Sequence, residues 1–249
     1  MEVELSFNHS LNYLGDHAVV LSFDVEMNDS SLNYVNKIAT ALNIFKNKYT
    51  WIKDIIPAYQ TITIVYDIYD YYLTEKVEPV LLFKKIIPPL IAEASANFTL
   101  NTITEVISVP VCYDIEFGID LKELARTKNI SIEALIQLHC NTIYTVYYLG
   151  FMPGFAYMGK VPEKIQTARH AKPRMKVYAG SIGIAGLQTG IYPTDSPGGW
   201  QIIGRTPLKI FDPHPSKLAL FKTGDRIQFY SINIEEFNIE LAKQTTPIN

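Results

Sequence analysis

Residues 147–213 read YYLGFMPGFAYMGKVPEKIQTARHAKPRMKVYAGSIGIAGLQTGIYPTDSPGGWQIIGRTPLKIFDP. This stretch holds ten of the chain's 13 glycines and seven of its 14 prolines. Glycine permits positive φ and close backbone approach, whereas proline fixes φ and removes a hydrogen-bond donor. We therefore expect short strands joined by tight, shaped turns here, and no long helices.

The same stretch is basic although the chain as a whole is acidic. It carries eight lysines and arginines against three acids, a net charge of +5, while the whole chain has a formal charge of −3. A basic, glycine-rich segment indicates a pocket for a small anion such as a carboxylate or a phosphate. A β-barrel with ordinary turns and a solvated basic face is the alternative, and composition leaves both open.

Size and composition narrow the class of protein. At 249 residues the chain can form one large domain or two smaller ones. Cys112 and Cys140 lie in apolar contexts without CxxC spacing, which argues for buried thiols in a reducing compartment. The N-terminus resembles no signal peptide, and no run of 18 apolar residues predicts a transmembrane helix. We expect a soluble cytoplasmic protein that binds neither nucleic acid nor membrane.

The first 97 residues predict a separate α+β domain. Capping oxygens at 28–31 precede apolar residues at helical spacing up to Phe45, and the β-branched residues 61–66 predict a strand. Residues 52–56 predict a second strand. Residues 75–95 predict a helix in two pieces, because prolines at 79, 88 and 89 interrupt the helical hydrogen bonds. The polar stretch NFTLN then marks the boundary.

Residues 98–249 predict a second domain that is richer in strands. We expect strands over 103–111, 142–149 and 226–232, and a helix over 121–127. Ser131 is a predicted N-cap for a further helix over 132–138, and the amphipathic tail from Glu235 is a predicted helix.

Five linked motifs run through residues 149–207 and carry a family resemblance. They are LGF-x-PGFAY-x-G, PR-x-x-V-x-AGS, Q-T-G-x-YP, SPGGW and IGRTP. Their order and spacing resemble the KipI/PxpB family, which comprises the B-type subunit of bacterial ATP-dependent 5-oxoprolinase and is also described as the kinase-inhibitor or allophanate hydrolase subunit 1 family. Upstream, Leu14-Gly15-Asp16, PVCYDIEFGIDL and Leu138-His139 are similar to it too, so the resemblance covers about residues 10–230.

The resemblance implies a fold and an activity. The implied fold is an N-terminal ferredoxin-like α/β sandwich, residues 1–97, followed by a C-terminal cyclophilin-like β-barrel, residues 98–249. The implied activity is one subunit's share in opening 5-oxo-L-proline to L-glutamate with hydrolysis of ATP, the co-substrate, which is usually accompanied by Mg²⁺. The implied partners are a KipA/PxpC-like subunit and a LamB/YcsF-like subunit. Two residues depart from the family pattern: Tyr178 replaces a usual proline, and His170 stands where arginine is common.

His139 and Arg205 are the catalytic candidates. An imidazole titrates near neutral pH and suits general acid–base catalysis, whereas the alternative is a histidine that holds a helix end or a turn. Arg205 lies between Gly204 and Thr206-Pro207, a rigid setting for a guanidinium fork that would bind a carboxylate or phosphate. For Arg205, as for Arg174, the alternative is an ion pair with Asp195 or Asp212 across the barrel.

The substrate-binding candidates come from the same motifs. Arg174 is a second anion-binding candidate, the Gln188-Thr189 amide and hydroxyl suit a polar lactam, and the Gly198-Gly199 amides suit an oxyanion. Trp200 forms an apolar wall of the pocket or, alternatively, packs in the core, and for Phe151 we favour packing. The full set of substrate-binding candidates is Arg174, Gln188, Thr189, Tyr192, Pro197, Gly198, Gly199 and Trp200.

Several chemistries have no signal in the sequence. We find no P-loop GxxxxGK[ST], no GxSxG nucleophile elbow and no carboxylate pair at metal-binding spacing, so we predict no metal site. Two other functions stay open: inhibition of a sensor histidine kinase through an exposed apolar surface, and allophanate or urea-amide hydrolysis. A concave pocket that joins His139, Gln188 and Arg205 would favour the 5-oxoprolinase interpretation.

Overall fold

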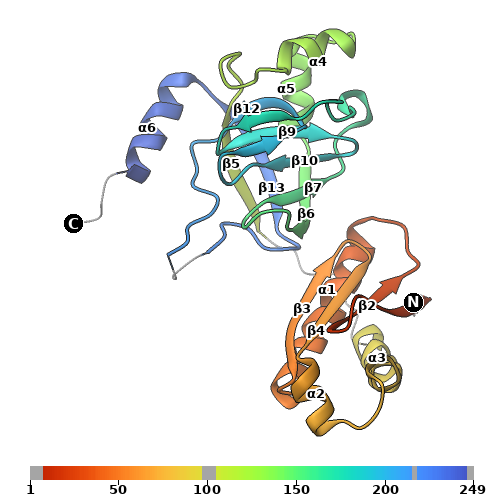
Figure 1. Cartoon of the computed structure of the whole chain (residues 1–249). Helices are drawn as coiled ribbons and strands as arrows, with labels where there is room; N and C mark the ends of the chain where they lie inside the picture. Colours follow the sequence, from red (N-terminus) through yellow and green to blue (C-terminus); the bar gives the residue numbers. More distant parts are fainter. Residues whose placement is uncertain (1–7, 97–104, 215–217, 246–249) are drawn as a thin grey trace. The chain divides into compact units, whose positions relative to one another are not determined.

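The computed structural model describes residues 8–96, 105–214 and 218–245. The chain divides into two units, residues 1–103 and 104–249, each with its own hydrophobic core (Figure 1). The predicted boundary between residues 97 and 98 lies outside the described residues and stays a prediction. Among the described residues, no helix is both long and apolar enough to cross a membrane.

The first unit is an antiparallel four-stranded sheet packed against two long helices. The strand order is β1-β2-β4-β3. Apolar side chains of β2 and β4 meet those of α1 and α3 to form the core. The elements are β1 (His9–Tyr13), β2 (Ala18–Phe23), α1 (Asp29–Lys48), β3 (Ile52–Ala58), β4 (Thr61–Tyr66), α2 (Ile68–Thr74) and α3 (Pro79–Ala96).

The start of α1 confirms the predicted capping. The Asn28 side chain accepts a hydrogen bond from the Ser31 amide at 2.9 Å, and the Asn28 amide donates to the Ser31 hydroxyl at 3.0 Å. This reciprocal pair satisfies two backbone donors that a helix start otherwise leaves unpaired. The strands predicted over 52–56 and 61–66 are confirmed by β3 and β4.

Two expectations for the first unit need correction or stay open. The predicted break in the helix near residue 88 is wrong, because α3 runs without interruption from Pro79 to Ala96 and contains Pro88 and Pro89. Pro79 is its first residue, where the missing N–H has no helical partner to lose. The ferredoxin-like arrangement is not confirmed. Two strands precede α1, and the first of them, β1, is the edge strand of the sheet beside β2.

The second unit is built on a closed barrel with the strand order β10-β7-β6-β13-β5-β12-β9. Strands β8 and β11 pair separately as a two-stranded ladder. The helices are α4 (Leu121–Thr127), α5 (Ile132–Cys140), α6 (Ile234–Thr245) and the 3₁₀ turn Glu163–Ile165. The strands are β5 (Val106–Cys112), β6 (Ile143–Leu149), β7 (Ala156–Gly159), β8 (Arg174–Val177), β9 (Ser181–Ala185), β10 (Gln188–Ile191), β11 (Ser196–Gly198), β12 (Gln201–Arg205) and β13 (Arg226–Ile232).

The barrel follows from alternating apolar residues in its strands. β5 and β13 pair in parallel, and their inward residues, such as Val109, Val111 and Phe229, are buried in one cluster. The β13 and α4 bounds agree with the predicted ranges, and the Ser131 hydroxyl accepts the Ala134 amide at 3.1 Å at the start of α5. The closed barrel fits the predicted barrel domain, while the cyclophilin-like assignment stays a prediction.

We expect Asn28→Ala to lower the free energy of unfolding by about 1 kcal/mol, because the first turn of α1 loses its cap. Urea denaturation of the full chain measures the loss. Ser30→Ala is the matched control, since Ser30 is exposed in the same turn and makes no described side-chain hydrogen bond. An equal loss in both variants would contradict the capping role.

Candidate functional site

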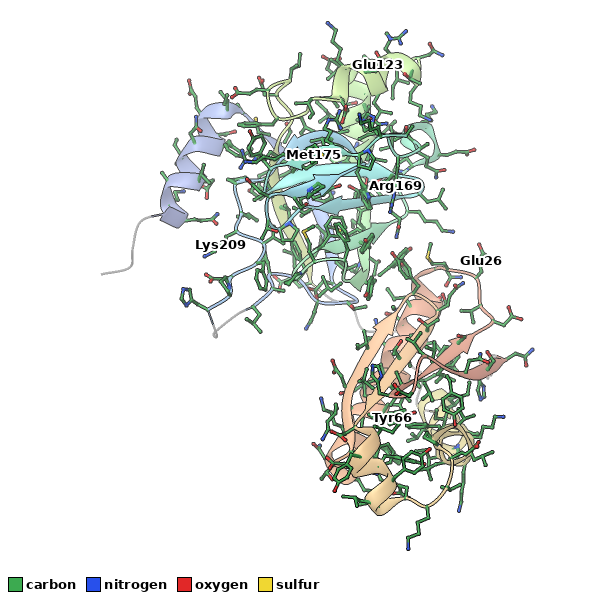
Figure 2. All side chains as sticks on the ribbon, viewed as in Figure 1. Glu26, Tyr66, Glu123, Arg169, Met175 and Lys209 are labelled. Carbon is green, nitrogen blue, oxygen red and sulfur yellow. The ribbon has the colours of Figure 1, made fainter. Side chains whose placement is uncertain are left out.

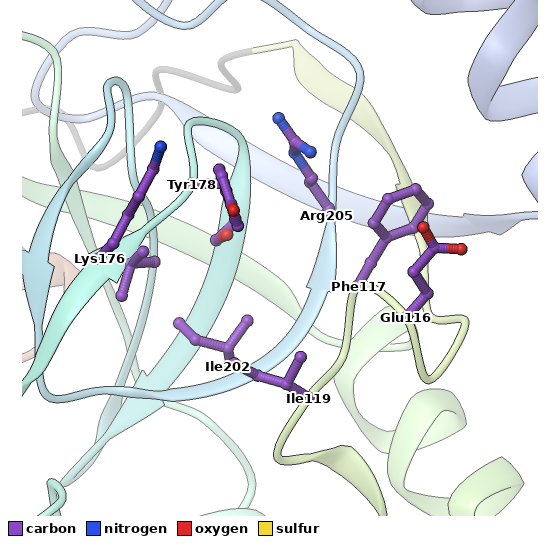
Figure 3. A pocket seen from close by; sticks show the side chains of 9 residues that line it. Glu116, Phe117, Ile119, Lys176, Tyr178, Ile202 and Arg205 are labelled. Carbon is purple, nitrogen blue, oxygen red and sulfur yellow. The ribbon is translucent and has the colours of Figure 1, made fainter.

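A cavity of about 360 Å³ opens on the second unit, between the turn after β5, strand β8 with the residue after it, and strand β12 (Figure 3). Its lining combines cations, aromatic rings and aliphatic side chains. The lining residues are Glu116, Phe117, Ile119, Lys176, Val177, Tyr178, Ser181, Ile202 and Arg205. We call this cavity the Arg205 pocket.

The Arg205 side chain is held by its stem while its fork stays free. Nε donates to the Ala179 carbonyl at 2.7 Å, and Cζ lies 5.9 Å from the Phe117 ring centroid and 5.6 Å from that of Tyr178. Among the described residues, the two terminal nitrogens have no hydrogen-bond acceptor. Aromatic faces attract the cation without neutralising it, so the fork remains available to a carboxylate or phosphate.

Gly180 allows the turn before β9 to approach β12 closely. Its φ is +82°, and a Cβ built there would lie 2.4 Å from the Thr206 carbonyl oxygen. The Thr206 amide also donates to the Gly180 carbonyl at 2.9 Å. A larger residue would push this turn, and the carbonyl that holds Arg205, away from the strand.

Lys176, by contrast, is already neutralised. Its Nζ lies 2.9 Å from an Asp195 carboxylate oxygen and 4.5 Å from the Tyr178 ring centroid. The hydrogen bond to Asp195 raises the pKa of Lys176. The Ala179 amide and then Lys176 lower the pKa of Asp195 by hydrogen bonding. The charge of Arg205 also lowers the pKa of Asp195, but no hydrogen bond or ion pair joins the two residues among the described contacts. Arg205 is therefore the cation of the pocket whose terminal nitrogens have no described partner.

Asp120 joins the walls of the Arg205 pocket. One carboxylate oxygen binds Arg174 Nη2 and lies 3.3 Å from His170 Nε2, and the other accepts the Ile202 amide at 2.6 Å. The Asp120 amide also donates to the Ile202 carbonyl at 2.9 Å. This carboxylate is buried, so Arg174 is committed to compensating its charge. A direct contact between Arg174 and a substrate stays a prediction.

His139 lies in the core of the barrel, within α5, and its ring is fully buried. The Tyr113 hydroxyl lies 2.7 Å from Nδ1, the Thr189 hydroxyl lies 2.9 Å from Nε2, and the ring stacks on Phe229 at 4.6 Å between centroids. Thr189 in turn donates to the Gly183 carbonyl at 3.2 Å. Those partners assign the tautomer with the proton on Nε2.

Burial lowers the pKa of His139 to about 3, so the ring is neutral at physiological pH. His139 also does not line the Arg205 pocket. This geometry favours the structural alternative for His139, and a role as general acid–base catalyst stays a prediction without a contact to the pocket.

The other predicted substrate-binding residues are not brought to the Arg205 pocket. Thr189 is occupied by His139, and Gln188 is half-buried in β10 opposite Gly159. Tyr192 and Trp200 are buried together with Phe155 in an aromatic cluster, which supports the packing alternative for Trp200.

The SPGGW turn shows a structural use of glycine. A Cβ at Gly198 would lie 2.4 Å from the Tyr192 hydroxyl oxygen, so this glycine lets β11 pass over the aromatic cluster. Gly199 is half-buried and Pro197 is exposed. The expectation that Phe151 packs is wrong: the side chain is 67% exposed, at a φ of +70° in the turn before β7.

Sequence reasoning missed much of the lining of the Arg205 pocket. Three lining residues lie in the segment PVCYDIEFGIDL, which in sequence carries part of the family resemblance and no site prediction: Glu116, Phe117 and Ile119. Acidic and aromatic residues between a strand and a helix were the available signal. Tyr178 was noticed only as a departure from the family pattern. Among the described residues, no group of three or more histidine, cysteine or acidic side chains is placed to hold a metal.

Residues 9–221 match the family described as carboxyltransferase domain, subdomain C and D. The B-type subunit of 5-oxoprolinase from Bacillus subtilis (strain 168) is 36% identical over 237 residues, which are 94% of this chain and 97% of that protein. The chain belongs to the KipI/PxpB family. The Haemophilus influenzae protein of the same name is 47% identical over 129 residues, which are 52% of this chain and 61% of that protein.

Solved structures extend the family comparison. A conserved uncharacterized protein from Pyrococcus horikoshii is 36% identical, with a TM-score of 0.52, and covers 92% of this chain and 100% of its own. The urea amidolyase of Kluyveromyces lactis shares the fold alone, with a TM-score of 0.71 and 17% identity over 94% of this chain and 15% of its own. Another solved relative is 29% identical, with a TM-score of 0.68. The match covers 87% of this chain but only 40% of that protein's length.

We expect Asp120→Ala to lower the free energy of unfolding by about 3 kcal/mol, since it leaves the partly buried Arg174 without its counter-charge. Chemical denaturation measures the loss. Glu240→Ala removes an exposed ion pair with Lys243 at 2.6 Å and should cost less than about 1 kcal/mol. A loss of under about 1 kcal/mol for Asp120→Ala would contradict the role given to this carboxylate.

The neutral, buried His139 predicts that the chain loses stability in acid. In the unfolded chain the imidazole takes up a proton below its ordinary pKa of 6.5, but the folded chain does so only near 3. Stability is therefore complete above pH 6.5 and falls by about 1.4 kcal/mol per pH unit as the pH decreases toward 3. Urea denaturation at several values between pH 7.5 and 5 measures this slope.

His139→Gln is the variant that isolates the effect, because glutamine does not titrate. Its unfolding free energy should fall less steeply with decreasing pH than that of the native chain. Parallel pH profiles of the two proteins would show that folding does not lower the pKa of His139.

Proposed function

We propose that this chain is a subunit of an ATP-dependent 5-oxoprolinase, which converts 5-oxo-L-proline to L-glutamate. The relatives named as B-type subunits of 5-oxoprolinase support a place in such a complex. A lactam is a poor electrophile. In the proposed reaction the γ-phosphoryl group of ATP passes to the lactam oxygen and ADP leaves. Water then attacks the activated carbon, the ring C–N bond breaks with protonation of the nitrogen, and a second water releases phosphate.

The free fork of Arg205 is the observation that carries this proposal. Two unpaired guanidinium nitrogens in a cavity of about 360 Å³ suit the carboxylate of a small cyclic amide. Phe117 and Ile119 supply apolar walls for the ring methylenes. Ser181 adds a hydroxyl to the lining and Glu116 a carboxylate. The expected pocket that joins His139, Gln188 and Arg205 is not formed, because only Arg205 lines the cavity. The histidine kinase alternative predicted an exposed apolar surface without a polar pocket, and the polar lining of the Arg205 pocket supports the enzyme over that alternative.

The chain offers only part of the required chemistry. It has no P-loop, and His139 is enclosed in the core, so the Arg205 pocket has neither a nucleotide motif nor an imidazole. We therefore assign the nucleotide, any Mg²⁺ and the remaining proton transfer to a site shared with a KipA/PxpC-like subunit, with a LamB/YcsF-like subunit needed for turnover. The two free cysteines are consistent with a reducing compartment, so the cytoplasm is the proposed location.

We expect Arg205→Ala to lower kcat/KM for 5-oxoproline about 100-fold, because a charge-assisted pair worth about 3 kcal/mol is lost. The assay is 5-oxoproline-dependent ATP hydrolysis by this chain co-expressed with the two partner subunits. Arg205→Lys keeps the charge but not the fork and should retain only part of the activity. Arg126→Ala is the control, since Arg126 is exposed and its described ion pair is with the exposed Glu123.

Two results would overturn the proposed function. One is unchanged kcat/KM in folded Arg205→Ala. The other is the absence of 5-oxoproline-dependent ATP hydrolysis with the two partners, together with tight binding to a sensor histidine kinase.

A further inference from the structure

Next to the Arg205 pocket, the segment 169–178 forms an exposed surface of unusual composition. Met175 in β8 is 87% exposed (Figure 2). Tyr178, which lines the pocket, is 55% exposed. Ile119, on the opposite wall of the pocket, is 54% exposed. Large apolar side chains gathered at one place on a soluble protein indicate an interaction surface. We call residues 169–178 the β8 ridge.

The β8 ridge is also strongly basic. It contains four lysines and arginines and no acid. Arg174 and Lys176 are compensated by Asp120 and Asp195, as described above. Arg169 and Lys172 are exposed, and among the described residues neither has an acidic partner. Arg169 lies over the Trp200 ring, with Cζ 5.9 Å from the centroid. The ridge therefore complements an acidic surface.

The β8 ridge is held in place before any partner binds. Strand β8 pairs with β11, Arg174 is anchored on Asp120, and the His170 amide donates to the Gly199 carbonyl at 2.7 Å. A surface ordered in advance loses little conformational entropy on binding. Because Lys176 and Tyr178 belong both to the ridge and to the pocket, a protein that covers the ridge also covers the pocket mouth.

We propose that the β8 ridge is the docking surface for the KipA/PxpC-like subunit that shares the site, whose matching face carries carboxylates opposite Arg169 and Lys172 and an apolar hollow for Met175. This inference rests on the proposed function. A second copy of the chain fits less well, because a two-fold contact brings like charges of the same surface together. Docking here would close the Arg205 pocket with groups that this chain lacks.

The test uses isothermal titration calorimetry to measure the affinity of the full chain for each purified partner, the KipA/PxpC-like and the LamB/YcsF-like protein. We expect Met175→Glu to weaken binding of the KipA/PxpC-like protein at least about 30-fold, the scale of an interface hot spot. A loss of affinity for the LamB/YcsF-like protein alone would contradict the proposal. Arg169→Glu with Lys172→Glu should weaken binding too and flatten its dependence on salt. Tyr69→Glu, at a 71% exposed position in α2, is the matched control and should bind like the native chain.

Each outcome supports or contradicts the proposal that the β8 ridge is a docking surface. Circular dichroism and urea denaturation confirm that the variants are folded. The proposal is overturned if Met175→Glu binds within about threefold of the native chain, if Tyr69→Glu loses as much, or if the native chain binds neither partner. Assembly without 5-oxoproline-dependent ATP hydrolysis would instead count against the proposed function and leave the docking surface standing.

Discussion

The buried carboxylate of Asp120 is the interaction on which the candidate site depends. By position it is the residue before the first turn of α4, where an aspartate commonly caps the helix, yet its side chain makes no such bond. Both oxygens instead bind across to β12 and to Arg174 of β8. A charge taken out of water must be compensated, so the three segments that enclose the pocket are bound to one group. The pocket has its shape because the charge of Asp120 is compensated by groups that belong to the pocket's own walls.

The same rule explains which cation is free to bind a ligand. Arg174 and Lys176 lie close to buried or neighbouring acids and are compensated inside the chain. The Cζ atom of Arg205 lies over the rings of Phe117 and Tyr178, which attract the cation and leave its two terminal nitrogens without a hydrogen-bond acceptor among the described residues. The net positive charge of the 147–213 stretch thus overstates its capacity for anions, since much of that charge serves the fold.

The family motifs divide between packing and the pocket. QTG and SPGGW serve packing: Thr189 holds His139 in the barrel interior, and Gly198 makes room for Tyr192 in the separate aromatic cluster. Arg205, from IGRTP, and the turn that follows β8 reach the Arg205 pocket. The relatives are named as subunits, which supports the proposal that this barrel contributes only part of a shared site.

Sequence alone determined the local structure and the family. Caps at Asn28 and Ser131, the strand patterns of β4 and β13, and five ordered motifs depend on near neighbours in the chain, so they can be read without a fold. The tertiary structure decided which polar residues meet. His139, Arg174 and Arg205 look alike as candidates in sequence, but one is buried, one is compensated by Asp120 and one is free. That difference depends on residues such as Phe117, Asp120 and Thr189, which lie 50 to 88 positions from the residues they touch and leave no local signal.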